Sequence, residues 1–364
     1  MYIRFGPTPA LLAAVRTLPL GPKVFGQRLR SWVALLLASI AAACVTSGVA
    51  AAQDVDNEGG GFTLVIENDL FSDDGQDRNY SSGLKLAFLT EARREPRWAR
   101  SIADLLPGYA ERLDTRFEFE IGQSMYTPRD LTRVIPDPED RPYAGLLYAS
   151  LGLISWTDED VLDQAQIVVG VVGPSSQAGE SQRWLHRQID GAVQPQGWDS
   201  QIPDQFVGEL RMRRTHRIPI AGGPQGAQMD IAPHAGFSLG NLTTSADVGA
   251  GFRVGWNLPV DFGPPRVSPS LPGSAYFITS RNAGWYLFGG VDGRYVAYSL
   301  VLDEPSAFGA SVQRRPWVGD AQLGGVAYWG DLRLAYTQVW RSREFESQRS
   351  DFSQFGAISV SWRN

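Results

Sequence analysis

The sequence has little cysteine, little histidine and, beyond residue 52, no long hydrophobic run. Among its 364 residues there is one cysteine, Cys44, and there are three histidines, His186, His216 and His234. One cysteine cannot form an internal disulfide or a metal site built from several thiolates. A bundle of transmembrane helices needs apolar segments of about 20 residues. Their absence beyond residue 52 excludes that class of membrane protein.

Positive charge is not in excess either. The formal net charge is −6 at pH 7, which argues against nucleic acid as a partner because binding to phosphates requires a basic surface. The chain is instead rich in glycine and aromatic residues, with 39 Gly, 17 Phe, 12 Tyr and 11 Trp. Soluble β-proteins can share this composition, so the pattern of residues must decide the class.

Residues 1–52 have the features of a secretory signal. Arg28 and Arg30 precede a short apolar run, Trp32–Val45, and a series of alanines ends at Ala52. A positive segment, a short apolar core and an A-x-A ending are typical of a signal peptide, and this core is too short for a transmembrane helix. We predict cleavage after Ala52, which leaves residues 53–364 as one domain.

Cys44 allows a second interpretation of this region. The segment Ala41-Ala42-Ala43-Cys44 is similar to a lipoprotein cleavage site, in which the cysteine receives the lipid. The branched residue that usually precedes the small pair is missing, so we favour the secretory signal.

Many segments of residues 53–364 alternate between apolar and polar side chains. Phe62, Leu64 and Ile66 share one face of a predicted strand, and Leu332–Trp340 shows the same alternation near the C-terminus. Strands of about ten residues with one apolar and one polar or small face are typical of a barrel wall that contacts lipid. A soluble β-sandwich alternates in the same way and stays the alternative.

The alternation predicts twelve strands. The ninth stays whole because one period-two pattern runs through Val291-Asp292-Gly293, and an even number is usual in bacterial barrels of one chain. The last strand ends the chain, where it can pair with the first and leave no unpaired edge in lipid. The predicted fold is all-β, a transmembrane antiparallel β-barrel with a short helix in a long extracellular loop. The predicted strands are 61–69, 80–90, 115–124, 144–157, 164–172, 206–217, 227–239, 246–257, 284–302, 320–329, 331–341 and 354–362.

The strand count predicts which connections lie outside the cell. If the N-terminus enters from the periplasm, the connections after odd-numbered strands are extracellular. The third of these, 173–205, is long and has a predicted helix from Gly179 to Asp190. Two predicted periplasmic connections, 91–114 and 258–283, are longer than the short turns expected there.

Polar motifs at the extracellular end are the candidates for chemistry. Glu67-Asn68-Asp69 ends the first strand, and Ser81 begins the second, so hairpin pairing brings them close. Asp69 with Asn68 could bind Ca²⁺, which prefers oxygen ligands, although Asn and Asp also end strands for local reasons. Ser81 could hydrogen-bond to a substrate or act as a nucleophile, but no G-x-S-x-G elbow is present.

His186 lies on the predicted helix of the third extracellular loop. Histidine can exchange a proton near neutral pH, so a histidine close to the carboxylates of the first hairpin is a candidate catalytic base. The alternative is a surface histidine without a role. His216 ends a strand at the other side and His234 lies within a strand, and for both we favour a structural role.

These motifs resemble the outer-membrane lipid A 3′-O-deacylases over nearly the whole chain after residue 52. The resemblance rests on their order and spacing, and its most specific part is Gly170-Val171-Val172-Gly173-Pro174 followed by His186-Arg187 and Gly197-Trp198. The other motifs that carry it are Glu67-Asn68-Asp69, Tyr80-Ser81-Ser82-Gly83, Gln123 with Tyr126-Thr127-Pro128, and Asp140-Arg141-Pro142-Tyr143-Ala144-Gly145.

The resemblance implies a Ca²⁺-dependent ester hydrolase that removes the acyloxyacyl chain from the 3′ position of lipid A. The implied functional residues are Asn68, Asp69, Ser81 and His186, with Asp69 as the metal ligand. His186 would activate a water molecule, and Ca²⁺ near Asp69 would stabilise the oxyanion. The expected partner is lipopolysaccharide in the outer membrane, and the expected state is a monomer with its site toward the exterior.

The sequence departs from the family pattern at a few positions. Ser81 stands where a threonine is expected, and Val193 and Gln194 stand where an acidic residue and a tyrosine are expected after the histidine. Two other functions stay open: a phospholipase or esterase that uses the same rim, and a barrel without catalysis that acts as a pore or a structural protein.

Overall fold

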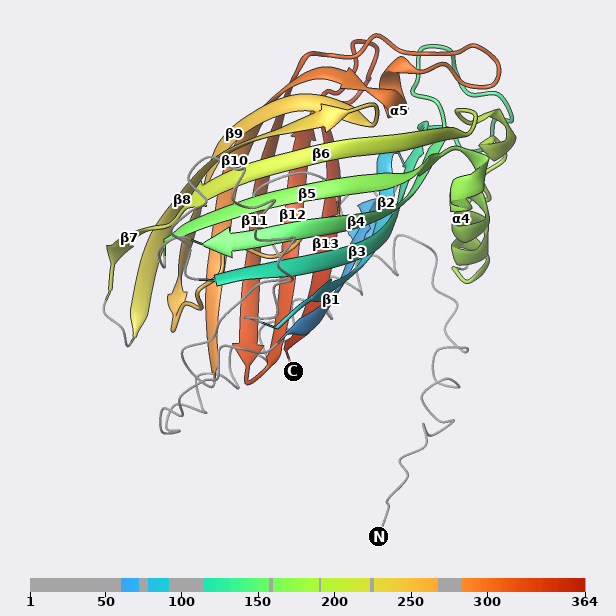
Figure 1. Ribbon diagram of the computed structural model, residues 1–364. Coiled ribbons are helices and arrows are strands. Elements are labelled where there is room, and N and C mark those ends of the chain that lie inside the picture. Colours follow the sequence, from blue (N-terminus) through green and yellow to red (C-terminus); the bar gives the residue numbers. More distant parts are fainter. Residues whose placement is uncertain are drawn as a thin grey trace, which may run out of the picture.

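The chain folds into a meander of antiparallel strands that closes into a cylinder (Figure 1). The computed structural model describes residues 60–71, 78–91, 114–156, 160–189, 191–222, 226–267 and 283–363. The predicted signal, residues 1–52, lies outside the described residues. The strands are β1 Gly61–Asn68, β2 Asn79–Leu89, β3 Asp114–Thr127, β4 Ala144–Trp156, β5 Val161–Val172, β6 Gln205–His216, β7 Ile218–Ala221, β8 Ala227–Gly240, β9 Thr243–Trp256, β10 Ala283–Ser299, β11 Trp317–Trp329, β12 Leu332–Ser342 and β13 Phe352–Arg363.

The barrel has twelve wall positions, as the alternation predicted. β6 and β7 together occupy one of these positions, because both pair with the same neighbouring strand, β8. The first and last strands close the cylinder, from Gly61 opposite Arg363 to Asn68 opposite Gly356. The ninth predicted strand is one strand, β10, but it ends at Ser299, where the helix α5 Leu300–Asp303 begins. The prediction that this strand reaches residue 302 is therefore wrong.

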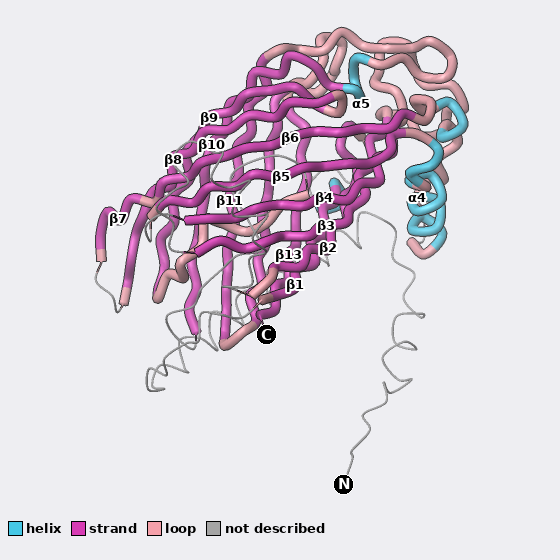
Figure 2. Tube along the Cα trace, viewed as in Figure 1, coloured by secondary structure: helices cyan, strands magenta, loops and turns pink. Residues whose placement is uncertain are grey.

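The connections after β1, β3, β5, β8, β10 and β12 lie at one end of the barrel. We call it the α4 end, after the helix α4 Ala178–Arg187. These connections also contain the short helices η1 Asp69–Phe71, η2 Pro174–Ser176 and η3 Trp198–Ser200, and Figure 2 shows α4 and α5 at this end. The predicted helix Gly179–Asp190 is α4 with shifted bounds. It ends at Arg187 because the backbone turns there, and Asp190 lies outside the described residues.

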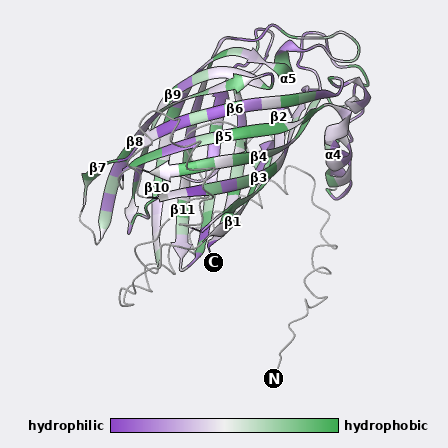
Figure 3. Cartoon of the chain, viewed as in Figure 1, coloured by the Kyte–Doolittle hydropathy of each residue, from purple (hydrophilic) through white to green (hydrophobic). Residues whose placement is uncertain are grey.

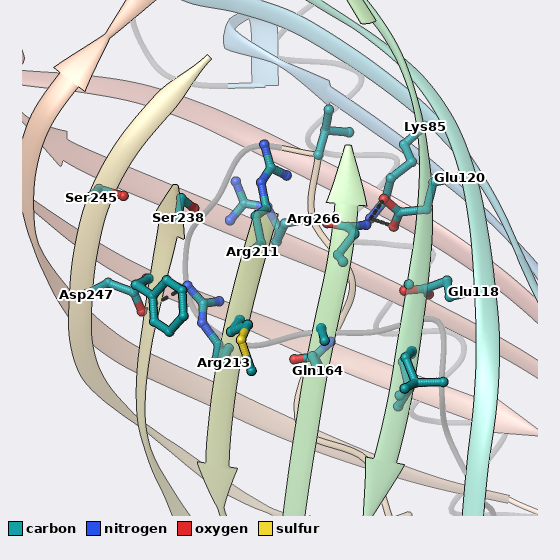
Figure 4. A pocket seen from close by; sticks show the side chains of 18 of the residues that line it. Lys85, Glu118, Glu120, Gln164, Arg211, Arg213, Ser238, Ser245, Asp247 and Arg266 are labelled. Atoms are coloured by element: carbon teal, nitrogen blue, oxygen red, sulfur yellow. Dashed lines mark hydrogen bonds and ion pairs between the residues drawn. The ribbon is translucent and has the colours of Figure 1, made fainter. Parts of the chain in front are cut away.

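Hydrophobic and hydrophilic residues both occur along each strand of the wall (Figure 3), and their exposure shows that the two faces of the wall have opposite character. Apolar side chains such as Phe62, Leu84 and Ile121 are exposed on the outer surface. Charged and polar side chains point inward and are buried, for example Lys85, whose Nζ donates to Oε1 of Glu120 at 2.7 Å (Figure 4). A soluble β-sandwich would bury its apolar face, so this arrangement rules out that alternative.

Exposed aromatic side chains lie on the outer surface near both ends of several strands. Trp256, Trp329 and Trp362 are exposed at the C-terminal ends of their strands. Toward the α4 end, Tyr295 and Trp317 are also exposed, and their rings meet at 5.1 Å. Aromatic residues in these positions are typical of the two interfaces of a membrane. Among the described helices, none is long and apolar enough to span a membrane.

Part of the connection between β9 and β10 lies inside the barrel. Phe262 packs in one cluster with Ala87, Leu89, Ile154 and Leu162, of which Ala87 and Leu89 alternate with the exposed side chains of β2 and therefore point inward. This segment was predicted within a periplasmic connection, 258–283. Residues 258–267 instead fill the lumen, which explains why the connection is longer than a turn. Residues 268–282 and 92–113 lie outside the described residues.

Asp261 anchors this segment to the inner wall. Its Oδ2 accepts hydrogen bonds from Tyr286 Oη at 2.7 Å and from Arg333 Nη1 at 3.0 Å, and Arg253 pairs with its other oxygen. Asp261 and Arg333 are fully buried. Removing one partner of a buried charge pair leaves the other charge uncompensated.

We therefore expect Asp261→Asn to lower the free energy of unfolding by about 3–5 kcal/mol. Unfolding by guanidinium in detergent micelles, followed by tryptophan fluorescence, measures the change. The matched control is Asp351→Asn, because Asp351 pairs with Arg343 while its side chain is 77% exposed, and an exposed pair contributes about 0–1 kcal/mol. Equal midpoints for the two variants would contradict the anchoring role.

Candidate active site

The helix α4 packs against the outside of the barrel at the α4 end. Met125 of β3 and Gly145 of β4 are paired across the sheet and belong to the outward-facing series of their strands. Met125 packs in one cluster with Leu131, Tyr143, Ala178 and Trp198. The loop is also tied to β3 by Gln123, whose side chain donates to the carbonyl of Ser176 at 2.7 Å. The helix is thus fixed on the surface that otherwise contacts lipid.

One face of α4 points toward the wall. Ala178, Gln182 and His186 are buried, and they are spaced by four residues, which places them on one side of a helix. The buried indole nitrogen of Trp198 donates to Oε1 of Gln182 at 2.7 Å. This bond joins the helix to the end of its own loop, so His186 is presented to the barrel by a braced element.

The ring of His186 is held by the backbone of its own loop. Nδ1 lies 2.6 Å from the carbonyl oxygen of Val193. A carbonyl can only accept, so Nδ1 carries the proton and the lone pair of the neutral ring is on Nε2. A histidine in this tautomer can accept a proton at Nε2, which is the requirement for a general base.

The end of β1 bends over the outer face of β13. Phe71 of η1 lies so close to Gly356 that a Cβ at Gly356 would be 2.5 Å from the Cβ of Phe71. Gly356 is paired with Asn68. The absence of a side chain at Gly356 therefore allows η1 to lie against the sheet and places Asp69 at the outer rim.

Asn68 and Asp69 are buried and shape the local backbone. Oδ1 of Asn68 accepts from the backbone N–H of Leu70 at 2.7 Å, and Oδ2 of Asp69 accepts from the N–H of Arg78 at 2.9 Å. By alternation Asn68 faces outward with Ile66. Glu67 points inward and accepts from Tyr80 Oη at 2.7 Å. Glu67 and Asn68 thus lie on opposite faces of the wall, and Asp69 begins the η1 turn that follows the strand.

Ser81 lies at an irregularity of β2. The pairing with β3 shifts between Tyr80 and Ser82, and Oγ of Ser81 lies 2.5 Å from Oγ1 of Thr127. Both hydroxyl groups are buried. Thr127 belongs to a motif of the sequence but was not predicted as a site residue, because its partnership with Ser81 depends on the shifted pairing.

One row of paired residues crosses the outer face, and Asp69 and Ser81 are the chain neighbours of two of its members; we call it the polar row. Asn68 is paired with Ser82, Ser82 with Met125, and Met125 with Gly145, where α4 is seated. Neighbouring strands are about 4.8 Å apart, so the backbone of Asn68 is about 10 Å from that of Met125. The structure therefore brings the first hairpin and the histidine helix to the same face and the same end.

Apolar side chains lie directly next to the polar row on the lipid side. Ile66 and Leu84 are paired with each other, and Leu64 and Leu86 follow one row further. All four are exposed. A ligand with a polar head and long acyl chains would contact both regions at once, with its ester groups at the row.

The other two histidines lie outside this row, as expected. His216 ends β6 at the opposite end of the barrel and is exposed. His234 points into the lumen, where its Nε2 lies 2.9 Å from Oδ2 of Asp292. Neither residue can reach the outer face of the first hairpin.

The oxygen donors of the first hairpin suit a calcium ion. The carboxylate of Asp69 and the amide oxygen of Asn68 are hard ligands. Within the described part of the chain, no group of three histidine, cysteine or acidic side chains gathers at Asp69. The remaining ligands would therefore come from backbone, amide, hydroxyl or water oxygens, all of which Ca²⁺ accepts. Asp73, Asp74 and Asp77 lie outside the described residues.

The fold and the site together define an outer-membrane β-barrel with a polar site on its lipid-facing rim. The sequence matches the model of the family described as outer membrane protein LpxR over residues 35–364. The chain therefore belongs to this family, which is the outer-membrane lipid A deacylase family that the motifs resemble.

One comparison with a solved structure supports the fold. LpxR from Salmonella typhimurium superposes with a TM-score of 0.68 at 18% sequence identity, covering 83% of this chain and 99% of that one. The β-domain of the Bordetella autotransporter BrkA matches with a TM-score of 0.41 at 8% identity, covering 84% and 99%. No curated protein sequence matches this one.

The brace between Gln182 and Trp198 yields a test of how α4 is held. Gln182→Leu leaves the buried indole N–H without its acceptor, a change that costs about 1–3 kcal/mol. We expect cleavage of the loop 173–204 by a protease to become about tenfold faster, while the barrel unfolds at the same denaturant concentration.

The matched control is Arg183→Leu, because Arg183 pairs with Glu180 on the more exposed side of α4. It should leave the cleavage rate unchanged. Equal rates for wild type and Gln182→Leu would show that the loop does not depend on this hydrogen bond.

Proposed function

We propose that this chain is a lipid A 3′-O-deacylase, which hydrolyses the ester that holds the acyloxyacyl chain at the 3′ position. The observation that carries the proposal is the polar row, which faces lipid beside a helix that presents a histidine base. Lipid A is an amphiphile with esters at the boundary between head group and acyl chains, which matches a polar row next to exposed apolar side chains. The α4 end would then face the cell exterior.

His186 is the general base of the proposed reaction. With its proton fixed on Nδ1 by Val193, Nε2 takes a proton from a water molecule as that water attacks the ester carbonyl. The same proton is then available for the alkoxide that leaves. Because α4 is braced against the wall, the imidazole ring is already oriented before the substrate binds, and no entropy is lost in ordering it during the reaction.

Asp69 and Asn68 would hold Ca²⁺, with Asp69 as the charged ligand. When bound, the ion supplies positive charge next to the ester carbonyl and stabilises the oxyanion of the tetrahedral intermediate. The hydroxyl group of Ser81 is hydrogen-bonded to that of Thr127. In the proposed reaction Ser81 orients the substrate and donates a hydrogen bond near the developing charge. The proximity of Thr127 to Ser81 supports a positioning role over that of a nucleophile, for which a base next to Ser81 would be needed.

Two other functions use the same fold. A phospholipase at this rim would share His186 and Asp69, and only the substrate would differ. A barrel without catalysis would not need a braced histidine helix on its outer face. The lumen also contains the segment 258–267 and the charged network around Lys85 and Glu120, which favours an enzyme over an open pore.

Mass spectrometry of lipid A from cells that express the chain tests the function. We expect loss of the 3′ acyloxyacyl mass with the wild type, and a rate lower by about 10²–10⁴ with His186→Gln, because a general base contributes that factor. His216→Gln is the matched control and should act like the wild type. Unchanged lipid A with altered phospholipid would support a phospholipase, and no change in either lipid would support a barrel without catalysis.

Removal of calcium tests the role of Asp69. We expect a chelator to abolish deacylation by the purified wild type and added Ca²⁺ to restore it. Asp69→Asn should behave like the chelated protein at ordinary Ca²⁺ concentrations, because the charged ligand is lost. Asp130→Asn, at an exposed acid of the nearby loop between β3 and β4, should keep its activity. Full activity in the chelator would exclude the metal.

A further inference from the structure

A second group of possible metal ligands lies inside the barrel, away from the polar row. In the part of the chain that the structure describes, His234, Asp247 and Asp292 each offer a ligand atom, and these atoms all lie within 4.8 Å of one another. They belong to the adjacent strands β8, β9 and β10 and are all buried. We call them the interior cluster.

The pairing of the strands explains how the cluster forms. Gly249 of β9 lies between the other two strands, opposite His234 on one side and opposite Asp292 on the other. A Cβ at Gly249 would lie 2.7 Å from Nε2 of His234. Only glycine therefore lets the imidazole cross β9 and reach Asp292, where Nε2 lies 2.9 Å from Oδ2.

Two atoms of the cluster have no hydrogen-bond partner. These are Nδ1 of His234 and Oδ1 of Asp292, in side chains that are 6% and 4% exposed as residues. Buried polar atoms are nearly always satisfied, and exceptions often indicate a ligand or ion that binds there. His234 and Asp292 thus each have a buried polar atom that could still contact an ion or a ligand.

The neighbouring charged side chains do not bind these two atoms, because they are paired with other groups. Asp320, the next acid along the inner wall, is paired with Arg341 at 2.8 Å and Arg294 at 3.4 Å. Asp247 accepts from Nη2 of Arg213 at 3.1 Å through Oδ2, as Figure 4 shows on the wall of a cavity in the lumen. A carboxylate has a second oxygen, so Asp247 can bind an ion while it keeps its contact with Arg213.

We propose that His234, Asp247 and Asp292 bind one divalent transition-metal ion such as Zn²⁺. Imidazole and carboxylate groups are ligands that zinc prefers, and calcium would not favour the imidazole. The two carboxylates supply negative charge for the dication, and Asp247 shares its charge with Arg213. In a tetrahedral zinc site the ligand atoms are about 3.4 Å apart, so small side-chain movements complete the site and water can fill the fourth position.

The ion would join three neighbouring strands from within. It would lie on the inner surface of the wall and would be separate from the polar row on the outer surface. The proposal does not depend on the proposed deacylase activity, because neither Asn68, Asp69, Ser81 nor His186 takes part. Its effect is on metal content and on stability, since a ligand that binds only the folded state stabilises it.

The chain has three histidines at three different places, which gives a matched set of variants. The folded full-length mature protein in detergent is stripped with a chelator, dialysed against Zn²⁺, and its bound metal is measured by mass spectrometry. We expect one ion fewer per chain in His234→Gln and in Asp292→Asn than in the wild type. His216→Gln and His186→Gln should each keep the ion of the interior cluster.

Thermal unfolding of the same proteins separates loss of metal from loss of fold. Zn²⁺ should raise the unfolding temperature of the wild type and of His216→Gln, and it should not raise that of His234→Gln or Asp292→Asn, which should still migrate as folded barrels without metal. If His234→Gln binds as much Zn²⁺ as the wild type, or if His186→Gln alone loses it, the interior cluster is not a metal site.

Discussion

The whole structure depends on closure of the backbone hydrogen bonds around the barrel. In lipid an unpaired N–H or C=O group has no water to bind, so the first strand must pair with the last. Gly61 to Asn68 of β1 pair with β13 without a register shift. Once every strand is paired on both sides, side chains can point only inward or outward. This constraint gives every residue of the wall one of two environments.

The candidate active site is formed by side chains that point outward. Asn68 has the same orientation as Ile66, yet it lies at the end of its strand, where the apolar surface stops. A site in the lumen could receive only a ligand that leaves the membrane. A site on the outer rim can receive a lipid whose acyl chains stay beside the barrel. The position of α4 on this surface, held by Gln123 and Met125, therefore limits the substrate class more than the fold does.

Much of this could be predicted from the sequence, for a physical reason. The alternation of side chains is a local property of a strand, so the twelve wall positions and the end that carries α4 followed from it. The contents of the lumen did not. Residues 258–267 have no strand periodicity, and their place inside the barrel depends on contacts such as that of Phe262 with Leu162, far apart in the chain. The hydrogen bond between Ser81 and Thr127 likewise depends on a register shift that alternation does not encode.

The separation of the two histidine environments is the last consequence of closure. His186 and His234 lie on opposite sides of a wall that is one strand thick, so neither can substitute for the other. His186 is buried on a helix that packs against the outer surface, where its Nδ1 is held by the backbone carbonyl of Val193. His234 faces Asp292 across a glycine on the lumen side of the wall. In the proposed reaction the base must act on an ester at the outer surface, so it must come from a loop that folds back over that surface, and in the described part of the chain α4 carries such a histidine.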